Sequence, residues 1–454
     1  MPNHPFDSQL CPTRWLAPFG ALLFSLFVAG TNAQPYTQIS AGENHTCALL
    51  DSGGVHCWGD NFRGQLGNTT ALVGDESGLP IRVLNISTAA QIAAGREHNC
   101  AALKNGTVRC WGYNFRGQLG DGSTVANAVP VQVGGISNAV AVAAGGDHSC
   151  ALIAGGTIKC WGYNADGELG AGSTAFSSTS ALDVVGITNA IAISAGMLHT
   201  CALLATNRVR CWGYNNFGAL GDGTFVNRNA PVEISSFVAT AIDAGWHHTC
   251  ATYSGSVYCW GSNTNGLLGD TTTTARNLPV QSQGINAASQ VAGGEIHTCA
   301  RLTLGPGELR CWGNGGDGRL GNGETLNSLS PVRVLGYDNF IAVTAGRQHT
   351  CALIDGGSAK CWGRNTFGQL GNGEWGPTSA ERAPLYTAPK CELDIDGDGA
   401  INAATDGVIA TRVLAGLTGT NVTAGALGID ATRTTWPQIR LFLERACGVV
   451  GLKP

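Results

Sequence analysis

One sequence unit recurs seven times in this chain, and this repeat constrains the fold more strongly than any other feature. The first half of the unit reads Ala-Gly-x-x-His-[Thr/Ser/Asn]-Cys-Ala, and the second half reads Cys-Trp-Gly-x-Asn-x-x-Gly-x-Leu-Gly, with small departures. The first cysteines of successive units are 49 to 53 residues apart. A repeat of this length is typical of one supersecondary unit that packs against its own copies.

Each unit reads as a group of short β-strands. Residues 46–50, the turn 51–54 and residues 55–58 form a predicted hairpin with glycine in its turn. Another strand precedes this hairpin, as at 139–142, and a fourth follows the Gly-x-Leu-Gly turn. We expect the fourth strand to open with proline in five units, because a sheet tolerates proline at a strand start or edge. These prolines are Pro80, Pro130, Pro231, Pro279 and Pro331.

Four strands repeated seven times predict an all-β fold, a seven-bladed β-propeller over residues 34–388. A linear solenoid is the alternative, and closure into a ring is favoured because it removes exposed strand edges. For the closure, we expect the two ends of the chain to share one blade. Residues 383–386 would supply its proline-containing strand, and residues 36–40 would supply its inner strand.

The two cysteines of each unit face each other across the predicted hairpin. A three-residue turn centred on Ser52 places Cys47 opposite Cys57, and turns of other lengths keep this register in the fifth and sixth units. We therefore expect a disulfide in every unit. Zinc held by His45 and the two cysteines is the alternative, because these residues share one strand face. The predicted pairs are Cys47 with Cys57, Cys100 with Cys110, Cys150 with Cys160, Cys201 with Cys211, Cys250 with Cys259, Cys299 with Cys311, and Cys351 with Cys361.

The repeated histidine and tryptophan read as structural residues. We expect each histidine to hydrogen-bond the backbone of a neighbouring loop, and each tryptophan to pack between blades with its N–H satisfied. The sequence holds no nucleophile motif, Walker loop or dinucleotide fingerprint. We therefore expect no catalytic residue, and a protein that is not an enzyme.

Residues 1–33 read as a secretory signal peptide. Arg14 precedes an apolar run at 15–30, and Thr31-Asn32-Ala33 has the small residues of a cleavage site. The run is shorter than the ~20 residues of a membrane span. Cleavage would remove Cys11 and leave 16 of the 17 cysteines, an even number that suits complete pairing in an oxidising compartment. We expect a secreted, periplasmic or cell-envelope protein without a membrane segment after cleavage.

Residues 389–454 read as a separate, small α-helical module with a calcium loop. Oxygen-bearing side chains recur at calcium-loop spacing, and the acid expected at the twelfth position comes one residue late. A solvated acidic turn is the alternative. We expect helices at 406–417 and 436–446, and a disulfide between Cys391 and Cys447. The candidate calcium ligands are Asp394, Asp396, Asp398, the Ala400 carbonyl, Asn402 and Asp406.

The repeat resembles that of the regulator of chromosome condensation (RCC1) family, in the cysteine-containing variant of exported bacterial proteins. This resemblance covers residues 36–388. It rests on the Gly-Gln-Leu-Gly turn at 64–67, 117–120 and 368–371, with the histidine and Trp-Gly at fixed offsets. It implies a propeller with a binding role. The C-terminal module is similar to dockerin modules, with one calcium loop instead of two, which implies docking to a cohesin-type partner.

These features predict an exported, non-enzymatic scaffold that binds an unidentified protein partner through variable loops, such as 67–79 and 171–184. Two alternatives stay open. One is a polysaccharide-active or carbohydrate-binding protein, and the other is guanine-nucleotide exchange, which the family resemblance implies. The net charge of −5 offers no global basic field for nucleic acid. We expect the propeller to be monomeric.

Overall fold

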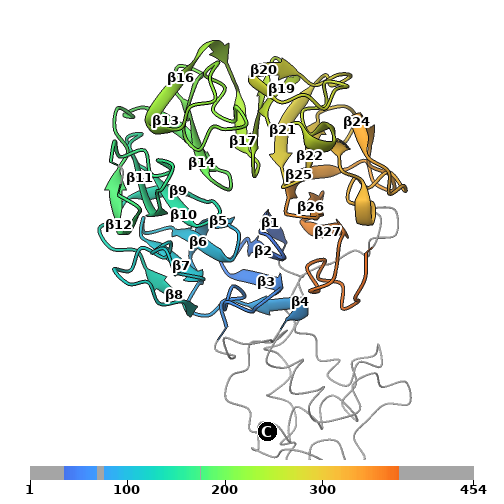
Figure 1. Cartoon of the computed structure of the whole chain (residues 1–454). Helices are drawn as coiled ribbons and strands as arrows, with labels where there is room; N and C mark the ends of the chain where they lie inside the picture. The colour runs from blue at the N-terminus through green and yellow to red at the C-terminus, as the bar shows by residue number, and fades with distance from the viewer. Residues whose placement is uncertain (1–34, 69–75, 174, 378–454) are drawn as a thin grey trace, which may run out of the picture. The chain divides into compact units, whose positions relative to one another are not determined.

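The computed structural model describes residues 35–68, 76–173 and 175–377, and these residues form seven β-sheets arranged around a common centre (Figure 1). Six sheets have four strands, and the seventh has three among the described residues. The predicted all-β, seven-bladed propeller is therefore confirmed. The predicted signal peptide, the predicted calcium module and residues 378–388 lie outside the described part of the chain.

Each blade runs from an inner strand near the centre to an outer strand at the rim, and neighbouring strands of a sheet pair antiparallel. The inner strands are β1 (Tyr36–Ala41), β5 (Ala89–Ala94), β9 (Ala139–Ala144), β13 (Ala190–Ala195), β17 (Ala241–Ala244), β21 (Ala288–Gly293) and β25 (Phe340–Ala345). The second strands are β2 (His45–Leu50), β6 (His98–Leu103), β10 (His148–Ile153), β14 (His199–Leu204), β18 (His248–Tyr253), β22 (His297–Leu302) and β26 (His349–Ile354).

The outer half of each blade contains the third and fourth strands. The third strands are β3 (Val55–Gly59), β7 (Val108–Gly112), β11 (Ile158–Tyr163), β15 (Arg208–Gly213), β19 (Ser256–Gly261), β23 (Glu308–Gly313) and β27 (Ser358–Gly363). The outer strands are β4 (Ser77–Arg82), β8 (Asn127–Gln132), β12 (Ser177–Asp183), β16 (Arg228–Val238), β20 (Arg276–Gln281) and β24 (Ser328–Arg333). Two short 3-10 turns follow third strands, namely η1 (Thr264–Gly266) and η2 (Gly316–Gly318).

The central hairpin of each blade carries a disulfide in the predicted register. Cys47 lies directly opposite Cys57, and the Cα–Cα distances of the seven pairs are 4.0 to 4.1 Å. The fifth blade keeps the register with a two-residue turn, in which Ser254 and Gly255 have positive φ angles of 50° and 78°. The seven predicted disulfides are confirmed, and the zinc alternative is wrong because the sulfurs bond to each other. The predicted pair of Cys391 and Cys447 lies outside the described residues.

Seven disulfides favour an oxidising environment outside the cytoplasm, since thiols stay reduced inside it. Within residues 35–68, 76–173 and 175–377, the structure has no helix of the length and apolar character that a bilayer crossing requires.

The hydrophobic core lies between adjacent blades. Trp111 is fully buried in one such layer, and its Nε1 donates a 3.0 Å hydrogen bond to the Gln65 carbonyl of the preceding blade. Gly67 has a φ of +73°, and a Cβ at this position would lie only 2.7 Å from a methyl group of Val83. The Gly-x-Leu-Gly turn therefore requires glycine at its end, because the turn is pressed between two sheets. The predicted packing of tryptophan between blades is confirmed.

The repeated histidines link each blade to the next. Each histidine Nε2 lies 2.8 to 2.9 Å from a side-chain oxygen at the start of the next blade's second strand. The prediction that histidine bonds a loop backbone directly is wrong. The side chain that accepts from the histidine lies between the ring and the loop, and it donates its own hydrogen bond to the loop carbonyl. The linked pairs are His45 with Asn99, His98 with Ser149, His148 with Thr200, His199 with Thr249, His248 with Thr298, His297 with Thr350, and His349 with Thr46.

The hydrogen-bond pattern shows which ring nitrogen of these histidines carries a proton, and burial determines their charge. Thr200 directs its only hydroxyl proton to the Glu168 carbonyl at 3.1 Å, because a carbonyl can only accept. The hydroxyl oxygen must then accept from Nε2–H of His148. Burial lowers the pKa of His148 to about 4 and that of His98 to about 3, so these rings are neutral near pH 7.

Among the described residues, the first and seventh blades meet by contact, and no blade combines strands from both ends of the chain. β1 pairs with β2, the strand that follows it, so the first blade uses one continuous stretch of chain. The sequence predicts that β1 and residues 383–386 belong to one blade. This is wrong for β1, because β1 belongs to the four-stranded first blade, where a short loop places it beside β2. The first and seventh blades meet through the backbone N–H of Tyr36, which donates to the Gly357 carbonyl at 2.9 Å, and through the histidine link from His349 to Thr46.

Two further predictions about the outer strands need correction. Pro80 lies inside β4 rather than at its start, and the register shifts here because Gly59 pairs with Ser77 while Cys57 pairs with Ile81. Proline is accommodated in this irregular stretch of an edge strand, where no regular ladder partner needs its missing N–H. The predicted variable loop 171–184 contains strand β12, so much of it is sheet.

Candidate functional site

Two loops of each blade lie on the same side of the ring, which we call the loop face. The first joins the inner strand to the second strand, and the other follows the third strand. A backbone hydrogen bond connects them in each of the seven blades, as from Tyr113 N–H to the Glu97 carbonyl at 2.9 Å. Glu97 occupies one of the two x positions of the repeat, so variable side chains sit on a constant backbone frame.

Backbone hydrogen bonds also join the first loops of neighbouring blades. These loops surround one end of the cavity at the centre of the ring, which we call the mouth. Each of the seven junctions has such a bond, with N···O distances of 3.1 to 3.3 Å. This continuous ring of bonds makes the mouth a rigid platform. In each pair the first residue donates its N–H and the second accepts with its carbonyl. The pairs are Glu43 with Arg96, Arg96 with Gly145, Gly146 with Gly196, Met197 with Trp246, Trp246 with Gly294, Glu295 with Gly346, and Arg347 with Gly42.

Charged side chains from five consecutive blades form a network on this platform. Arg96 Nη2 lies 3.0 Å from Asp147 Oδ1, and Arg96 Nε lies 4.0 Å from Glu43 Oε2. Arg347 continues the network, with its Nη1 at 2.5 Å from Glu43 Oε1 and its Nε at 2.6 Å from Glu295 Oε2. Each arginine thus bridges the carboxylates of the blades on either side of it.

The carboxylates of this network are partly withdrawn from water. Burial raises the pKa of Glu43 and of Asp147 above the ordinary values, although the neighbouring arginines act in the opposite direction. Glu97 follows the same pattern, with burial as the largest cause of its raised pKa. Each arginine of the network pairs with carboxylates from the blades on both sides, so positive and negative groups alternate on this surface.

The rest of the platform is apolar and aromatic. The fourth and fifth blades place Met197 and Trp246 at the positions that carry charges elsewhere on the mouth. Beside them, the rings of Phe217 and His247 lie 5.4 Å apart between centroids, and Phe217 is 40% exposed. Aromatic, methionine and arginine side chains are the residues that protein interfaces favour.

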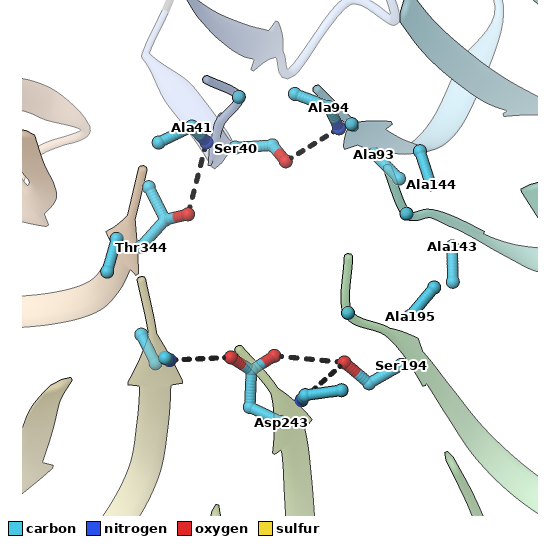
Figure 2. A pocket seen from close by; sticks show the side chains of 18 of the residues that line it. Ser40, Ala41, Ala93, Ala94, Ala143, Ala144, Ser194, Ala195, Asp243 and Thr344 are labelled. Atoms are coloured by element: carbon cyan, nitrogen blue, oxygen red, sulfur yellow. Dashed lines mark hydrogen bonds between the residues drawn. The ribbon is translucent and has the colours of Figure 1, made fainter. Parts of the chain in front are cut away.

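The inner strands surround a central cavity with a volume of about 250 Å³ (Figure 2). Alanine is the most frequent residue in its wall, and small hydroxyl side chains connect neighbouring inner strands. Ser40 Oγ accepts from the N–H of Ala94 at 2.9 Å, and Thr344 Oγ1 accepts from the N–H of Ala41 at 3.1 Å. These bonds satisfy strand-edge groups that face the cavity.

Asp243 is the one carboxyl group that the described inner strands present to this cavity. Its Oδ1 accepts from Ser194 Oγ at 3.1 Å, and its Oδ2 accepts from the N–H of Gly293 at 2.7 Å (Figure 2). Burial raises the pKa of Asp243 to about 6, while the two hydrogen bonds act in the opposite direction. The carboxylate thus connects the fourth, fifth and sixth blades.

The predicted calcium site lies in a part of the chain that the structure does not describe. Within residues 35–68, 76–173 and 175–377, no group of three or more His, Cys, Asp or Glu side chains is arranged to hold a metal ion. The predicted calcium ligands, from Asp394 to Asp406, lie outside these residues, so the calcium site stays a prediction.

Neither the charge network nor the apolar and aromatic part of the platform was predicted as a site from the sequence. Arg96 and Asp147 belong to different units, and both occupy x positions where the repeat shows no pattern. The available signal was the position itself: a loop position that varies between otherwise matching units indicates a surface free to specialise.

Comparison with known proteins identifies the family of this fold. A family model described as an RCC1-like domain matches residues 23–339, and the regulator of chromosome condensation (RCC1) repeat matches residues 340–369. The chain belongs to the RCC1 family. RCC1-like propellers generally serve as protein-binding scaffolds.

Curated relatives of this RCC1-family chain are longer than the shared region. The ultraviolet-B receptor UVR8 of Arabidopsis thaliana is 31% identical over 328 residues, which cover 70% of this chain and 62% of the receptor. The probable E3 ubiquitin-protein ligase HERC6 of Homo sapiens is 30% identical over 337 residues, which cover 72% of this chain and 28% of the ligase.

Solved structures show the same RCC1 fold. Human WBSCR16 matches with a TM-score of 0.61 at 22% identity, covering 71% of this chain and 88% of that one. Prp20p from Saccharomyces cerevisiae matches with a TM-score of 0.60 at 24% identity, covering 69% of this chain and 81% of that one. At these identities the likeness shows the fold alone.

Proposed function

We propose that this protein is an exported, non-enzymatic scaffold that holds a protein partner on its loop face. The observation that carries the proposal is the mouth of the ring. A closed circle of seven backbone hydrogen bonds there supports a charge network, and the Arg347 guanidinium carbon of this network lies 5.8 Å from the ring centroid of Trp246. A rigid surface with arginine and aromatic side chains binds with little loss of conformational entropy.

The test compares two aromatic substitutions on opposite faces of the ring. Trp246→Ala removes a ring at the mouth, and Tyr253→Ala removes a 43% exposed ring from the end of β18, next to the turn into β19. The immobilised wild-type protein is used to capture partners from the medium or envelope of the producing cell. A captured protein is then purified, and its affinity for the wild type and both variants is measured by calorimetry.

We expect Trp246→Ala to weaken binding of the purified partner about tenfold or more, as loss of an interface aromatic does. Tyr253→Ala should leave the affinity unchanged. The proposal is wrong if Tyr253→Ala abolishes binding while Trp246→Ala has no effect, because the partner would then bind the other face.

The calcium module is a separate proposal that the sequence supports. Titration of the full chain with Ca²⁺ should give a saturable heat, and substitution of Asp394 and Asp396 by Ala should remove it. Equal heats for the wild type and this variant would show that the loop binds no calcium. Neither carbohydrate binding nor nucleotide exchange gains a specific observation from the described residues.

A further inference from the structure

Aromatic rings and guanidinium groups alternate along the loop face of the first three blades. All of these residues belong to the loops that follow the third strands or to the adjoining strand ends. We call this row the aromatic strip. It consists of Phe62, Arg63, Tyr113, Phe115, Arg116, Tyr163 and Phe176.

The first half of the aromatic strip connects the first and second blades. The Arg63 guanidinium carbon lies 4.9 Å from the ring centroid of Phe62 and 4.9 Å from that of Tyr113. Tyr113 then stacks on Phe115, with centroids 6.4 Å apart and ring planes 13° apart. Cation–π contact with two rings fixes the guanidinium between neighbouring blades.

The second half repeats this arrangement between the second and third blades. The Arg116 guanidinium carbon lies 5.5 Å from the Phe115 centroid, 5.6 Å from the Tyr163 centroid and 4.8 Å from the Phe176 centroid. Tyr163 and Phe176 also meet edge to face, at 5.3 Å between centroids. The strip is therefore continuous across three blades.

The phenylalanines of the strip are unusually accessible for such large apolar side chains. Phe62 is 51% exposed, Phe115 is 64% exposed and Phe176 is 53% exposed. A single exposed ring on a protein surface is ordinary, but a row of them held in place by arginines marks an interaction site.

The charges around the strip favour a neutral ligand. Arg63 Nε lies 3.9 Å from Glu97 Oε1, and Arg116 interacts electrostatically with Asp147. Arg63 thus has a carboxylate beside it, and Arg116 has one within electrostatic range. An anionic polymer such as single-stranded nucleic acid would meet these carboxylates, so stacking on the rings would be opposed by repulsion.

The polar groups beside the strip favour a ligand that needs few hydrogen-bond partners. The Asn114 amide nitrogen already donates to oxygens of its own loop, including the Val125 carbonyl at 3.0 Å. Among the described residues, the hydroxyls of Tyr113 and Tyr163 have no hydrogen-bond partner. A glycan would need several partners for its hydroxyls, whereas two phenol donors suit a chain of carbonyl acceptors.

We infer that the aromatic strip binds a proline-rich segment of the partner in the polyproline II conformation. Proline rings supply apolar faces for Phe62, Phe115 and Phe176, and a proline carries no backbone N–H that would need an acceptor. The phenols of Tyr113 and Tyr163 donate to peptide carbonyls, which are fully solvated in this helix. This inference rests on the proposed function and adds the chemistry of the segment that the loop face recognises.

The test is a calorimetric titration of the full chain with a polyproline peptide of about ten residues, long enough for three turns of the helix. Three variants are compared with the wild type. Phe115→Ala removes the central ring, and Tyr113→Phe removes one hydroxyl and keeps its ring. Phe225→Ala is the matched control, because Phe225 is 51% exposed on the loop before β16 and lies outside the strip.

We expect saturable binding to the wild type that Phe115→Ala weakens about tenfold and Tyr113→Phe weakens about threefold. Phe225→Ala should bind as the wild type does. The effect of Tyr113→Phe separates a hydrogen-bonded complex from adsorption to exposed rings. Because the altered side chains are exposed, the folded state should persist, which intact hairpin disulfides and an unchanged circular dichroism spectrum would verify.

Three results would overturn the inference. One is no binding of the peptide by the wild type at about 1 mM. Another is equal weakening by Phe115→Ala and Phe225→Ala. The last is binding of cellohexaose or oligothymidylate, but not polyproline, in a manner that Phe115→Ala abolishes. If a captured partner still requires Trp246 while polyproline fails, only this inference is wrong and the proposed function stands.

Discussion

Glu168 stands where three other blades carry a glutamine, at Gln65, Gln118 and Gln369. The side chain is fully buried, and its Oε2 accepts from the N–H of Asp166 at 3.0 Å. Oε1 is buried without a hydrogen-bond partner in the described structure. Burial therefore raises the pKa of Glu168 to about 7, and the carboxyl can be neutral at a pH where exposed glutamates are ionised.

Glu168→Gln should stabilise the protein above neutral pH and have no effect in acid. Between pH 4.5 and about 7 the unfolded chain ionises first, so the wild type loses stability as the pH rises through this range. At about pH 8 the variant should be more stable by ~2–3 kcal/mol, and near pH 4 the two proteins should match.

Denaturant unfolding of both proteins without reductant, at the two pH values, checks this expectation. The exposed Glu324→Gln is the matched control and should change neither value. A stability gain of equal size at both pH values would show that Glu168 acts through packing and not through its charge.

The histidine links give a second prediction at the residue scale. Thr200→Val keeps the shape of the side chain but removes the hydroxyl that accepts from His148 and donates to the Glu168 carbonyl. The buried Nε2–H then lacks a partner, so the free energy of unfolding should fall by about 1–3 kcal/mol. Thr274→Val, at an exposed position, should leave it unchanged. Equal unfolding curves for both variants would contradict the role of the link.

At the scale of the element, the central hairpin was the most predictable part of the chain. Cysteine spacings of 10, 9 and 12 residues all place the two sulfurs opposite each other, once the turn length is adjusted. Local chain geometry determines this pairing, so the sequence alone is sufficient for it. The outer strands were less predictable, because the position of Pro80 depends on a register shift against β3 that no local pattern indicates.

Removal of one hairpin disulfide should weaken the protein without changing its fold. The double substitution Cys250→Ala and Cys259→Ala opens the shortest of the seven closed loops. The free energy of unfolding should fall by about 2–3 kcal/mol, since the chain-entropy effect of a short loop is modest. Thermal and denaturant unfolding measure the change. A variant that fails to form the other six disulfides would show that the blades do not fold as separate hairpins.

At the scale of the molecule, the closure of the ring and the proposed binding surface depend on contacts between residues that are far apart in sequence. The network of Arg96 and Arg347 with three carboxylates, which together come from five blades, exists only once the ring has formed. No spacing within a unit predicts it. The seven-bladed architecture was predictable because it follows from counting repeats, whereas the identity of the surface depends on residues that the repeat leaves variable.

A closed ring makes the junction of the first and seventh blades equivalent to the others. Thr46 accepts from His349 and donates to the Gln369 carbonyl, as Thr200 does at its own junction. Thr46→Val should therefore lower the free energy of unfolding by about as much as Thr200→Val, in the same range of about 1–3 kcal/mol. Unfolding of the two variants side by side measures this. An open ring would leave Thr46→Val without effect.

The most direct test of the account is a disulfide map of the protein purified from its natural source, made by mass spectrometry of peptides digested without reduction. The account predicts seven bonds, each within one hairpin, from Cys47 with Cys57 to Cys351 with Cys361. Bonds between different blades, or free thiols at these fourteen cysteines, would contradict a ring of separately closed blades formed outside the cytoplasm.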